Sequence, residues 1–493
     1  MQHKEATSHK HILKSTGIIG GEQIIVVLGG ILRSKLIALL MGPVGVGIAG
    51  LYQSSIDLIK NGTGLGLGFS AVRDVAEASQ TDDQMKISRT IFILRRWVWA
   101  TGLWGMLVVL LFCRQLSKYA FGNEGHAWEF ALLSVTVLFG AISSGQLALL
   151  QGLRKLVYLA KANIWGSIAG VVLAIPMFWF FRYEGIVFSL FLTAGSGLVI
   201  SWIYARKIKV LNVDINFKET FRDGLGMAKL GVFMVLSTFL SSGAMYIVRL
   251  LIIRKLNLGG VGEFQAAWTI SSIYLGTILT AMGADYFPRL SAVNADNHRI
   301  NVLVNEQTEI AILIAGPLII GLMSFSWILV YLLYSAKFGN SVVILDWQIL
   351  GTFLKVIQWP MGFVYLAKRM TSLFLFQEVL WNGLYLFIIW VGLPAFGIEI
   401  TGISFLIAYL VSSSLITFVL RSVTGFSWSS MNIRLLLIFG ALTLCSFLCC
   451  KTLHGPWQYL SGVLLSGGAL YISYYYLKRV ISIKDILTKF RSK

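Results

Sequence analysis

The sequence predicts an all-α polytopic membrane protein of about fourteen transmembrane helices, arranged as two six-helix lobes followed by two further helices. Composition is the first reason. Of the 493 residues, 56% are hydrophobic and only 13% are charged, which is too few to cover a soluble protein of this length. The second reason is a series of apolar segments of about 20 residues, the length that crosses a hydrocarbon core of about 30 Å. The third reason is an internal repeat.

The chain repeats itself at a shift of about 216 residues. Three pairs of positions correspond: Arg33 with Arg249, Trp165 with Trp381, and the Gly-Val-Gly triplet at 45–47 with that at 260–262. Each copy holds an even number of spans, so both copies have the same orientation, and we expect a pseudo-two-fold axis along the membrane normal. The lobes are expected at 1–212 and 213–425, with two additional helices and a basic tail at 426–493.

The expected spans follow the apolar segments in order. In the first lobe they lie at 16–40, 45–71, 90–112, 128–150, 157–181 and 185–204. In the second they lie at 228–253, 262–287, 310–334, 341–366, 371–393 and 401–420, and the additional pair lies at 433–450 and 457–477. The first segment is long and lacks a small-residue cleavage site, so it is expected to stay uncleaved. The polar segment 205–227 is the expected linker between lobes.

Charge distribution sets the expected orientation. Lys and Arg on the side of the termini outnumber those on the opposite side several times over, which places both termini in the cytoplasm. The net charge of +19 therefore indicates membrane topology, not nucleic-acid binding. The additional helix pair is expected to line a lipid-facing groove or to contact a partner.

Neither a metal nor a cofactor is expected. The cysteines Cys113, Cys445, Cys449 and Cys450 have no metal-ligand spacing with histidine and are interpreted as reduced packing residues. The glycines at 64, 66 and 68 are spaced as in a phosphate-binding loop, but they lie in an apolar span with no strand before it. That position favours helix packing.

Charged residues inside spans are costly and mark the candidate site. The basic ones are Arg33, Lys35, Lys60, Arg249 and Lys355. The acids are Glu22, Asp57 and Glu378, with Asp346 nearer a span end. This basic excess predicts a cavity that attracts an anion such as a phosphate or pyrophosphate.

Arg33 and Arg249 are the best candidates for binding that anion. The repeat gives them equivalent depths on the two lobes, and two guanidinium forks facing one cleft would hold a diphosphate. The alternative is that each arginine pairs with a local acid or extends to the outer interface.

Lys60 lies three residues after Asp57, on the same helix face. The two residues form an internal ion pair, or Lys60 is released to meet substrate when Asp57 takes up a proton. Lys35 either follows Arg33 into the cavity or extends outward.

Lys355 precedes Pro360, where we expect proline to interrupt the helix. Lys355 then faces the cavity or contacts an exposed carbonyl. Glu22 and Glu378, like Asp57, are candidates for binding a coupling proton or cation, although neighbouring helices could equally satisfy them.

Two segments carry a family resemblance. LRSKLIALLMGPVGVGIAGLYQS, at 32–54, resembles the junction of the first two spans in the polysaccharide-transport family, where an Arg and an apolar run precede Leu-Gly-Pro-x-Gly-x-Gly. GADYFPRLSAV, at 283–293, resembles the end of that family's eighth span. The chain departs from the pattern by adding Lys35 and by placing Met41 where Leu is commoner. The resemblance is greatest to O-antigen and enterobacterial-common-antigen flippases (Wzx type). These belong to the multidrug/oligosaccharidyl-lipid/polysaccharide exporter superfamily.

The resemblance implies a function. Such a flippase turns an undecaprenyl-diphosphate-linked oligosaccharide from the cytoplasmic to the outer leaflet of the bacterial inner membrane by alternating access. A cationic cavity receives the diphosphate and sugar, and the family's first-span arginine corresponds to Arg33. H⁺ or Na⁺ exchange, or the membrane potential, is the implied driving force. Membrane lipids and the pathway's polymerase are candidate partners.

Three alternatives remain at this point. A lipid II flippase differs only in substrate. A multidrug or cation antiporter of the same superfamily needs an acidic cavity and usually has twelve spans, so the basic excess and the two extra spans argue against it. A membrane polymerase or ligase needs a large outer loop for its acceptor, and the expected outer loops are short. We therefore expect a transporter and not an enzyme.

Overall fold

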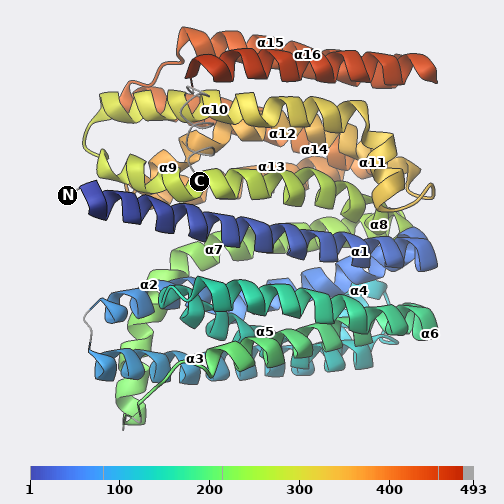
Figure 1. Ribbon diagram of the computed structural model, residues 1–493. Coiled ribbons are helices and arrows are strands. Elements are labelled where there is room, and N and C mark those ends of the chain that lie inside the picture. The colour runs from blue at the N-terminus through green and yellow to red at the C-terminus, as the bar shows by residue number, and fades with distance from the viewer. Residues whose placement is uncertain (1, 81–82, 212, 214, 454, 481–493) are drawn as a thin grey trace. The chain divides into compact units, whose positions relative to one another are not determined.

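The computed structural model describes residues 2–80, 83–211, 213, 215–453 and 455–480. Within these ranges the chain is built from helices, and no strand occurs among them (Figure 1). The expected all-α fold is confirmed. Residues 481–493, which belong to the expected basic tail, lie outside the described residues.

Close packing divides the chain into two compact units. One holds residues up to Gly262 together with Leu333–Ser335, and the other holds Glu263–Leu332 together with the residues from Ala336 onward. The boundary expected from the repeat, between 212 and 213, stays a prediction. The first unit contains α1 (Gln2–Thr63), α2 (Leu67–Ser79), α3 (Gln84–Leu111), α4 (Cys113–Phe121), α5 (Ala127–Gly152), α6 (Leu156–Ala205) and α7 (Phe217–Lys255).

The remaining helices follow the same alternation of long and short elements. They are α8 (Leu258–Trp268), the π-helix η1 (Thr269–Tyr274), α9 (Leu275–Ala292), α10 (Asn297–Ser324), α11 (Ser326–Leu333), α12 (Gly339–Ala367), α13 (Thr371–Phe396), the 3₁₀ turn η2 (Gly397–Glu399), α14 (Ile400–Thr424), α15 (Ser430–Thr452) and α16 (Pro456–Val480). The unit boundary falls within α8.

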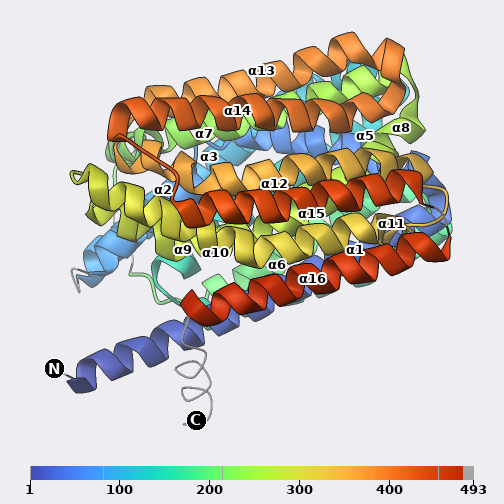
Figure 2. The ribbon, with the colours of Figure 1, turned by 90° about the horizontal axis from the view of Figure 1, so that it is seen from above.

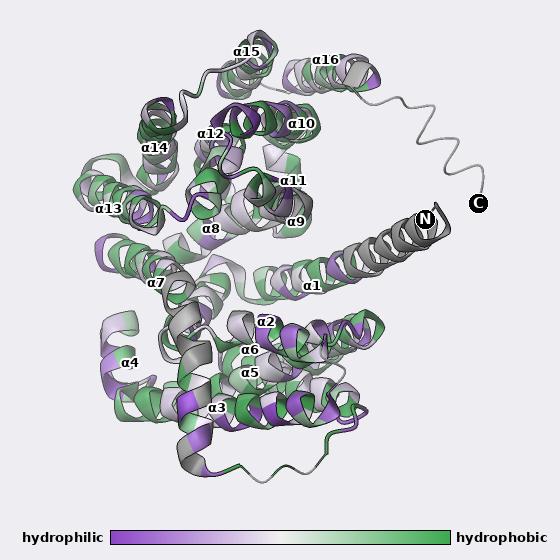
Figure 3. Cartoon of the chain, turned by 90° about the vertical axis from the view of Figure 1, so that its left-hand side faces the viewer, coloured by the Kyte–Doolittle hydropathy of each residue, from purple (hydrophilic) through white to green (hydrophobic). Residues whose placement is uncertain are grey.

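Nine described stretches are long and apolar enough to cross a membrane. Three of them, Gly21–Thr63, Leu156–Ala205 and Thr371–Thr424, have 43, 50 and 54 residues, which is enough for two crossings each. Two further apolar membrane helices come in addition to these stretches: one is formed by α8 and α9 together, and the other is α16. Hydrophobic residues, in green, occur along most of the helices in Figure 3. The chain is therefore a multi-pass membrane protein with about fourteen membrane helices.

Each long stretch reverses at a residue whose backbone leaves the helical region. Gly42 has φ 67°, which glycine adopts without steric cost, and Pro43 begins the returning arm at the position where proline is favoured. In the second copy of the repeat, α7 ends at Lys255 and α8 begins at Leu258, at the corresponding place. Arg182 (φ 50°) corresponds in the same way to Gly397 (φ 57°).

A pair of arginine turns shows the repeat at the opposite helix ends. Arg154 follows α5 with φ 54°, and Arg369 follows α12 with φ 57°. In both turns the next amide donates to the carbonyl five residues earlier, at 2.9 Å in the first and 2.7 Å in the second. This is the bonding of a Schellman helix end. The matching order of helices and turns is what the internal repeat predicts.

The linker is shorter than expected, because α7 already begins at Phe217 and includes the second half of the 205–227 segment. Contacts with α3 explain the difference. Arg96 donates to the carbonyl of Ile215 at 3.1 Å and to the Thr220 hydroxyl at 2.8 Å, and the Trp97 ring nitrogen donates to the carbonyl of Thr220 at 2.9 Å. These tertiary bonds outweigh the polar composition that indicated a loop.

The expected packing role of the glycines at 64, 66 and 68 holds only in part. Gly66 has φ 68° and lies in a break between α1 and α2, where Leu65 also has positive φ. Gly68 packs: a Cβ there would lie 2.9 Å from the Ser144 hydroxyl. The glycine run therefore both breaks one helix and brings the next close to α5.

The two additional helices pack on α10 in the second unit (Figure 2). Asn305 of α10 accepts from the amide of Ser429 at 2.8 Å, and Asn432 of α15 donates to the carbonyl of Asn305 at 2.9 Å. Ser324 and Ser446 share a hydrogen bond of 2.8 Å further along. Hydrogen bonds of this kind help membrane helices to associate, because lipid is as apolar as the helices and supplies no hydrophobic driving force for their association.

Candidate functional site

A polar pocket of about 500 Å³ in the first unit contains two of the predicted site residues, Glu22 and Arg33. It is bounded by α1, α5 and both arms of α6. Its uncharged polar lining consists of Gln23, Ser143, Asn163, Ser167, Thr193 and Ser201. Polar surface of this kind inside membrane helices favours a binding site.

Glycines leave the room for this pocket. A Cβ on Gly30 or on Gly197 would meet no atom within 4 Å, so the missing side chains leave open space. Gly29 instead permits a close approach, because a Cβ there would lie 2.5 Å from the Ser167 hydroxyl. Small residues thus bring α1 and α6 together while keeping a cavity between them.

Glu22 is buried, with 6% of its surface exposed, and its carboxylate accepts a 2.6 Å hydrogen bond from the Asn163 amide. An amide partner carries no charge, so protonation of Glu22 breaks no ion pair with it. Carboxylate, amide and hydroxyl oxygens are also the ligands that hard cations prefer. The arrangement can therefore hold a proton or a small cation.

Arg33 is half-buried, and its guanidinium donates to the Ser189 hydroxyl of α6 at 3.3 Å. The hydroxyl leaves the positive charge uncompensated, and a guanidinium has five N–H donors. Glu22 lies eleven residues away, about 16 Å along the helix. Arg33 can therefore offer paired donors to an anion in the pocket.

Lys35 points elsewhere: its ammonium donates to the carbonyl of Tyr334 at 2.7 Å. Tyr334 belongs to the three-residue piece that packs with the first unit. This contact favours the outward alternative for Lys35 over a place beside Arg33.

Asp57, Lys60 and Arg249 form a second charged group in the first unit. Asp57 accepts a 3.0 Å bond from Gln53, and the charges of Lys60 and Arg249 both act on it. Arg249 is only 5% exposed and donates to the carbonyl of Met245 at 2.7 Å. Arg33 contacts α6, whereas Arg249 contacts its own helix and acts through its charge on Asp57. Their joint action on one substrate stays a prediction.

The remaining candidates lie in the second unit. Lys355 is half-buried on α12, and Glu378 on α13 acts through its charge on Tyr409. Asp346 is buried near the start of α12. The expected interruption at Pro360 is wrong, because α12 runs through this residue from Gly339 to Ala367. Packing inside a bundle tolerates such a proline, because neighbouring groups satisfy the freed backbone.

Sequence reasoning missed the uncharged half of the pocket. Asn163, Ser167 and Thr193 are polar residues of a kind that occurs throughout membrane helices, so nothing in the sequence separates them from packing residues. The hydrogen bond between Glu22 and Asn163 joins positions 141 residues apart. Within the part of the chain that the structure describes, no group of three His, Cys, Asp or Glu side chains is placed to hold a metal ion.

Comparison with known proteins adds the family context. The model of the polysaccharide biosynthesis protein family matches residues 36–343. The lipid III flippase of Escherichia coli (strain K12) is 25% identical over 400 residues, which is 80% of this chain and 94% of that protein. The Shigella flexneri lipid III flippase matches to the same extent.

Solved structures show the same fold. The lipid II flippase MurJ, in an inward closed conformation, matches with a TM-score of 0.71 over 94% of this chain and 99% of that chain, at 13% identity. An inward-facing multidrug transporter of the MATE family, in the MOP superfamily, matches with a TM-score of 0.68 over 81% of this chain and 94% of that chain, at 16% identity.

Proposed function

The chain belongs to the polysaccharide biosynthesis protein family, and from this premise we propose that it is a flippase for undecaprenyl-diphosphate-linked oligosaccharide. It turns this lipid from the cytoplasmic to the outer leaflet of a bacterial inner membrane and acts as a transporter, not as an enzyme. Relatives named lipid III flippase and a fold shared with the lipid II flippase MurJ support a lipid-linked cargo. An O-antigen-like repeat unit is the cargo that we propose.

One observation carries the proposal: Arg33 lines an open pocket with a neutral hydroxyl as its hydrogen-bond partner. An uncompensated guanidinium inside a membrane protein costs free energy unless an anion binds to it. The diphosphate of the cargo supplies that anion, and the planar fork of Arg33 matches two phosphate oxygens. Cationic drugs would be repelled at this position.

The remaining residues take roles that follow from their contacts. Glu22 binds the coupling proton or cation beside Asn163, and its charge state changes the field in the pocket that holds Arg33. Arg249 and Lys60 supply further positive charge near Asp57. Two lobes at 1–212 and 213–425 rock between inward-open and outward-open states, as alternating access requires.

Transport by the purified protein in proteoliposomes tests the function. We compare a labelled polyprenyl-diphosphate oligosaccharide, the same glycan on a monophosphate, lipid II, and the cation ethidium. Preferred flipping of the diphosphate oligosaccharide is expected. Preferred flipping of lipid II would move the assignment to a lipid II flippase. Ethidium transport without lipid flipping would show an antiporter.

Filling the pocket provides a matched control for that assay. Gly197→Val places a side chain in open space of the pocket, so it should block flipping without disturbing packing. Gly467→Val on α16 also meets no atom within 4 Å, but it lies outside the pocket. Equal flipping rates of the two variants would show that the pocket is not part of the transport path.

Glu22→Gln is expected to uncouple transport from its driving gradient. The amide keeps the shape of the side chain but can neither take up a proton nor balance a cation. Gradient-stimulated flipping should fall by at least about tenfold, the effect of losing one charge-assisted interaction. Glu22→Asp should keep part of the stimulation, and Glu124→Gln, in an exposed loop, should keep all of it. A normal gradient response in Glu22→Gln would exclude this residue from coupling.

Both termini and the loop after α6 are expected on the cytoplasmic side. We expect a single cysteine replacing Lys209 in a cysteine-free background to react with an impermeant maleimide only after spheroplasts are opened. A cysteine replacing Glu124, in the loop between α4 and α5, should react in intact spheroplasts. The reverse labelling pattern would invert the topology.

A further inference from the structure

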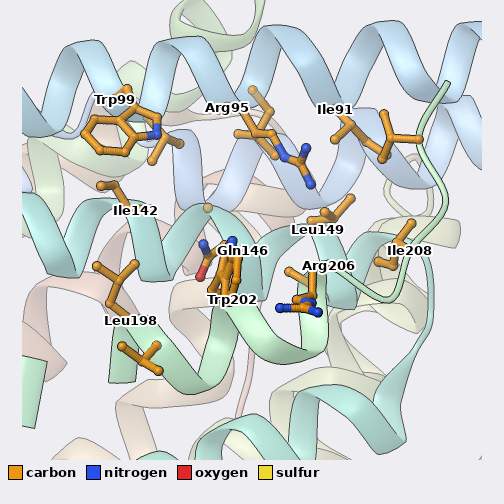
Figure 4. Close-up of a pocket in the computed structure, with 16 residues that line it drawn as sticks. Ile91, Arg95, Trp99, Ile142, Gln146, Leu149, Leu198, Trp202, Arg206 and Ile208 are labelled. Atoms are coloured by element: carbon orange, nitrogen blue, oxygen red, sulfur yellow. The ribbon is translucent and has the colours of Figure 1, made fainter. Parts of the chain in front are cut away.

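A second cavity, of about 740 Å³, lies between α3, α5 and the end of α6 (Figure 4). Its lining differs from that of the polar pocket on α5 and α6: Gln146, Leu198 and Trp202 line this groove, whereas Ser143, Gly197 and Ser201 line the pocket. Nothing in the proposed transport cycle uses it. Its volume is within the roughly 300–1,000 Å³ of ligand sites.

Two arginines line this groove. Arg95 points into it from α3, and Arg206 lies on its far side, directly after the last residue of α6 (Figure 4). The Arg206 guanidinium lies 4.8 Å from the centre of the Trp202 ring, which fixes its plane. Among the residues that line the groove, all of them described, none is acidic. The groove therefore presents two positive charges that no carboxylate of its wall compensates.

The rest of the wall is apolar. Away from the arginines it continues along Trp99, Ile142 and Leu198 (Figure 4). Trp202 and Val199 are 49% and 54% exposed, so the groove is open along the side of the helices, where a membrane protein faces lipid. A cationic end with an apolar continuation matches a molecule that has a phosphate head and a hydrocarbon chain.

We propose that this groove binds one anionic glycerophospholipid, with its phosphate between Arg95 and Arg206 and one acyl chain along Trp99 and Leu198. The position of the arginines supports a lipid of the leaflet on the side of the α6–α7 connection. Arg95 lies about three turns into α3 from its start at Gln84, and Arg206 ends α6, so both belong to the same end of the unit.

The wall favours a phospholipid over the oligosaccharide cargo. A bound glycan needs many hydrogen-bonding partners, and besides its two arginines this wall offers only Gln146 and the indole N–H groups of Trp99 and Trp202. The Gln146 carbonyl oxygen already accepts a 2.5 Å hydrogen bond from Ser201. A phosphodiester needs only the two guanidinium forks.

A lipid in this place would connect α3 to the chain that leads into α7. Ile208 and Val210 line the same groove and pack against the buried core of α2, α3 and α5. Arg96, next to Arg95, already bonds to Ile215 and Thr220. The phosphate would add a bridge from α3 to Arg206, where the same connection begins.

Native mass spectrometry of the full-length protein tests the proposal. The delipidated protein is titrated with phosphatidylglycerol, phosphatidylethanolamine and phosphatidylcholine of equal chain length. One phosphatidylglycerol should be retained with at least about tenfold preference, because the two arginines attract its net negative head group and repel the ammonium group of the other two lipids. The Arg95→Gln, Arg206→Gln variant should lose that preference. The Arg299→Gln, Arg421→Gln variant, which removes two exposed arginines of the second unit, should keep it.

A second variant tests the contact with the acyl chain separately from the contact with the phosphate. Leu198→Trp fills the apolar part and leaves both arginines, so it should lower phosphatidylglycerol retention as well. Gel-filtration profiles and melting temperatures show whether each variant is folded. Equal retention by the wild type and the folded double variant would overturn the site. Displacement of the lipid by millimolar inorganic phosphate alone, or retention unchanged in Leu198→Trp, would show that the groove binds phosphate without a lipid chain.

Discussion

Replacing Arg33 and Arg249 together by alanine is expected to abolish glycan transport. The expected loss is roughly a hundredfold or more, because each charge-assisted contact with a phosphate contributes about 1.5–3 kcal/mol. The readout is surface glycan in a flippase-null strain that carries the variant, together with the lipid-linked intermediate that accumulates in the inner leaflet. Arg33→Lys should keep part of the activity, because lysine retains the charge but loses the planar fork.

The two arginines need different controls because their surroundings differ. Arg33 is half-buried beside a hydroxyl, so Arg33→Ala should leave folding nearly unchanged. Arg249 is buried and its charge acts on Asp57, so Arg249→Ala leaves a carboxylate with less compensation. Breaking a buried charge pair can cost about 3–5 kcal/mol of stability. In the Arg249→Ala variant, adding Asp57→Asn should restore folding but should not restore transport.

Arg299→Ala is the matched control for a lost guanidinium. Its side chain is 71% exposed and pairs with Asp296 at 3.5 Å, as surface ion pairs with little net effect do. It should transport like the wild type. Full glycan restoration by a well-folded Arg33→Ala, Arg249→Ala variant would contradict the assignment, and phosphate binding would then have to involve Lys60 or Lys355.

The fold was largely predictable from the sequence, because a membrane imposes strong constraints. Backbone groups in lipid must be satisfied within helices, so apolar length alone predicts the spans. The repeat predicts corresponding turns, and the turns at Arg154 and Arg369 show that correspondence in their dihedral angles. The start of α7 was not predictable, because side chains of α3, which is remote in sequence, decide it.

The candidate site was predictable only in its charged half. Glu22 and Arg33 stand out because charge inside an apolar span is rare. Nothing in the sequence indicates that Asn163 meets Glu22, or that Lys35 points toward the carbonyl of Tyr334 and away from Arg33. Charge identifies candidates, whereas the direction of a side chain depends on helix rotation, which tertiary packing sets.

The glycine triplets of the repeat meet each other in the first unit. A Cβ on Gly47 would contact the carbonyl of Leu258 and lie 3.1 Å from the amide nitrogen of Gly262. A Cβ on Gly262 would contact the carbonyl of Pro43 and lie 2.9 Å from the amide nitrogen of Gly47. Both obstacles are backbone atoms, which cannot rotate away as a flexible side chain can. The Gly-Pro-x-Gly-x-Gly pattern therefore has a packing cause: it allows α8 to lie against the turn that begins at Gly42.

Gly262→Ala and Gly47→Ala are expected to destabilise the protein strongly. Overpacking costs about 1–3 kcal/mol, and an obstacle made of backbone places both substitutions at the upper end of that range. Elsewhere in a helix the same change stabilises by about 0.5–1 kcal/mol, because alanine loses less backbone entropy. Gly383→Ala on α13, where a Cβ meets no atom within 4 Å, is the matched control. Melting of the purified variants should therefore move in opposite directions, with lower folded yield for Gly262→Ala and equal or higher stability for Gly383→Ala. Gly262→Val should yield almost no folded protein. A wild-type melting temperature in Gly262→Ala would mean that the two helix ends separate readily, and the glycine pattern would then need a cause other than packing.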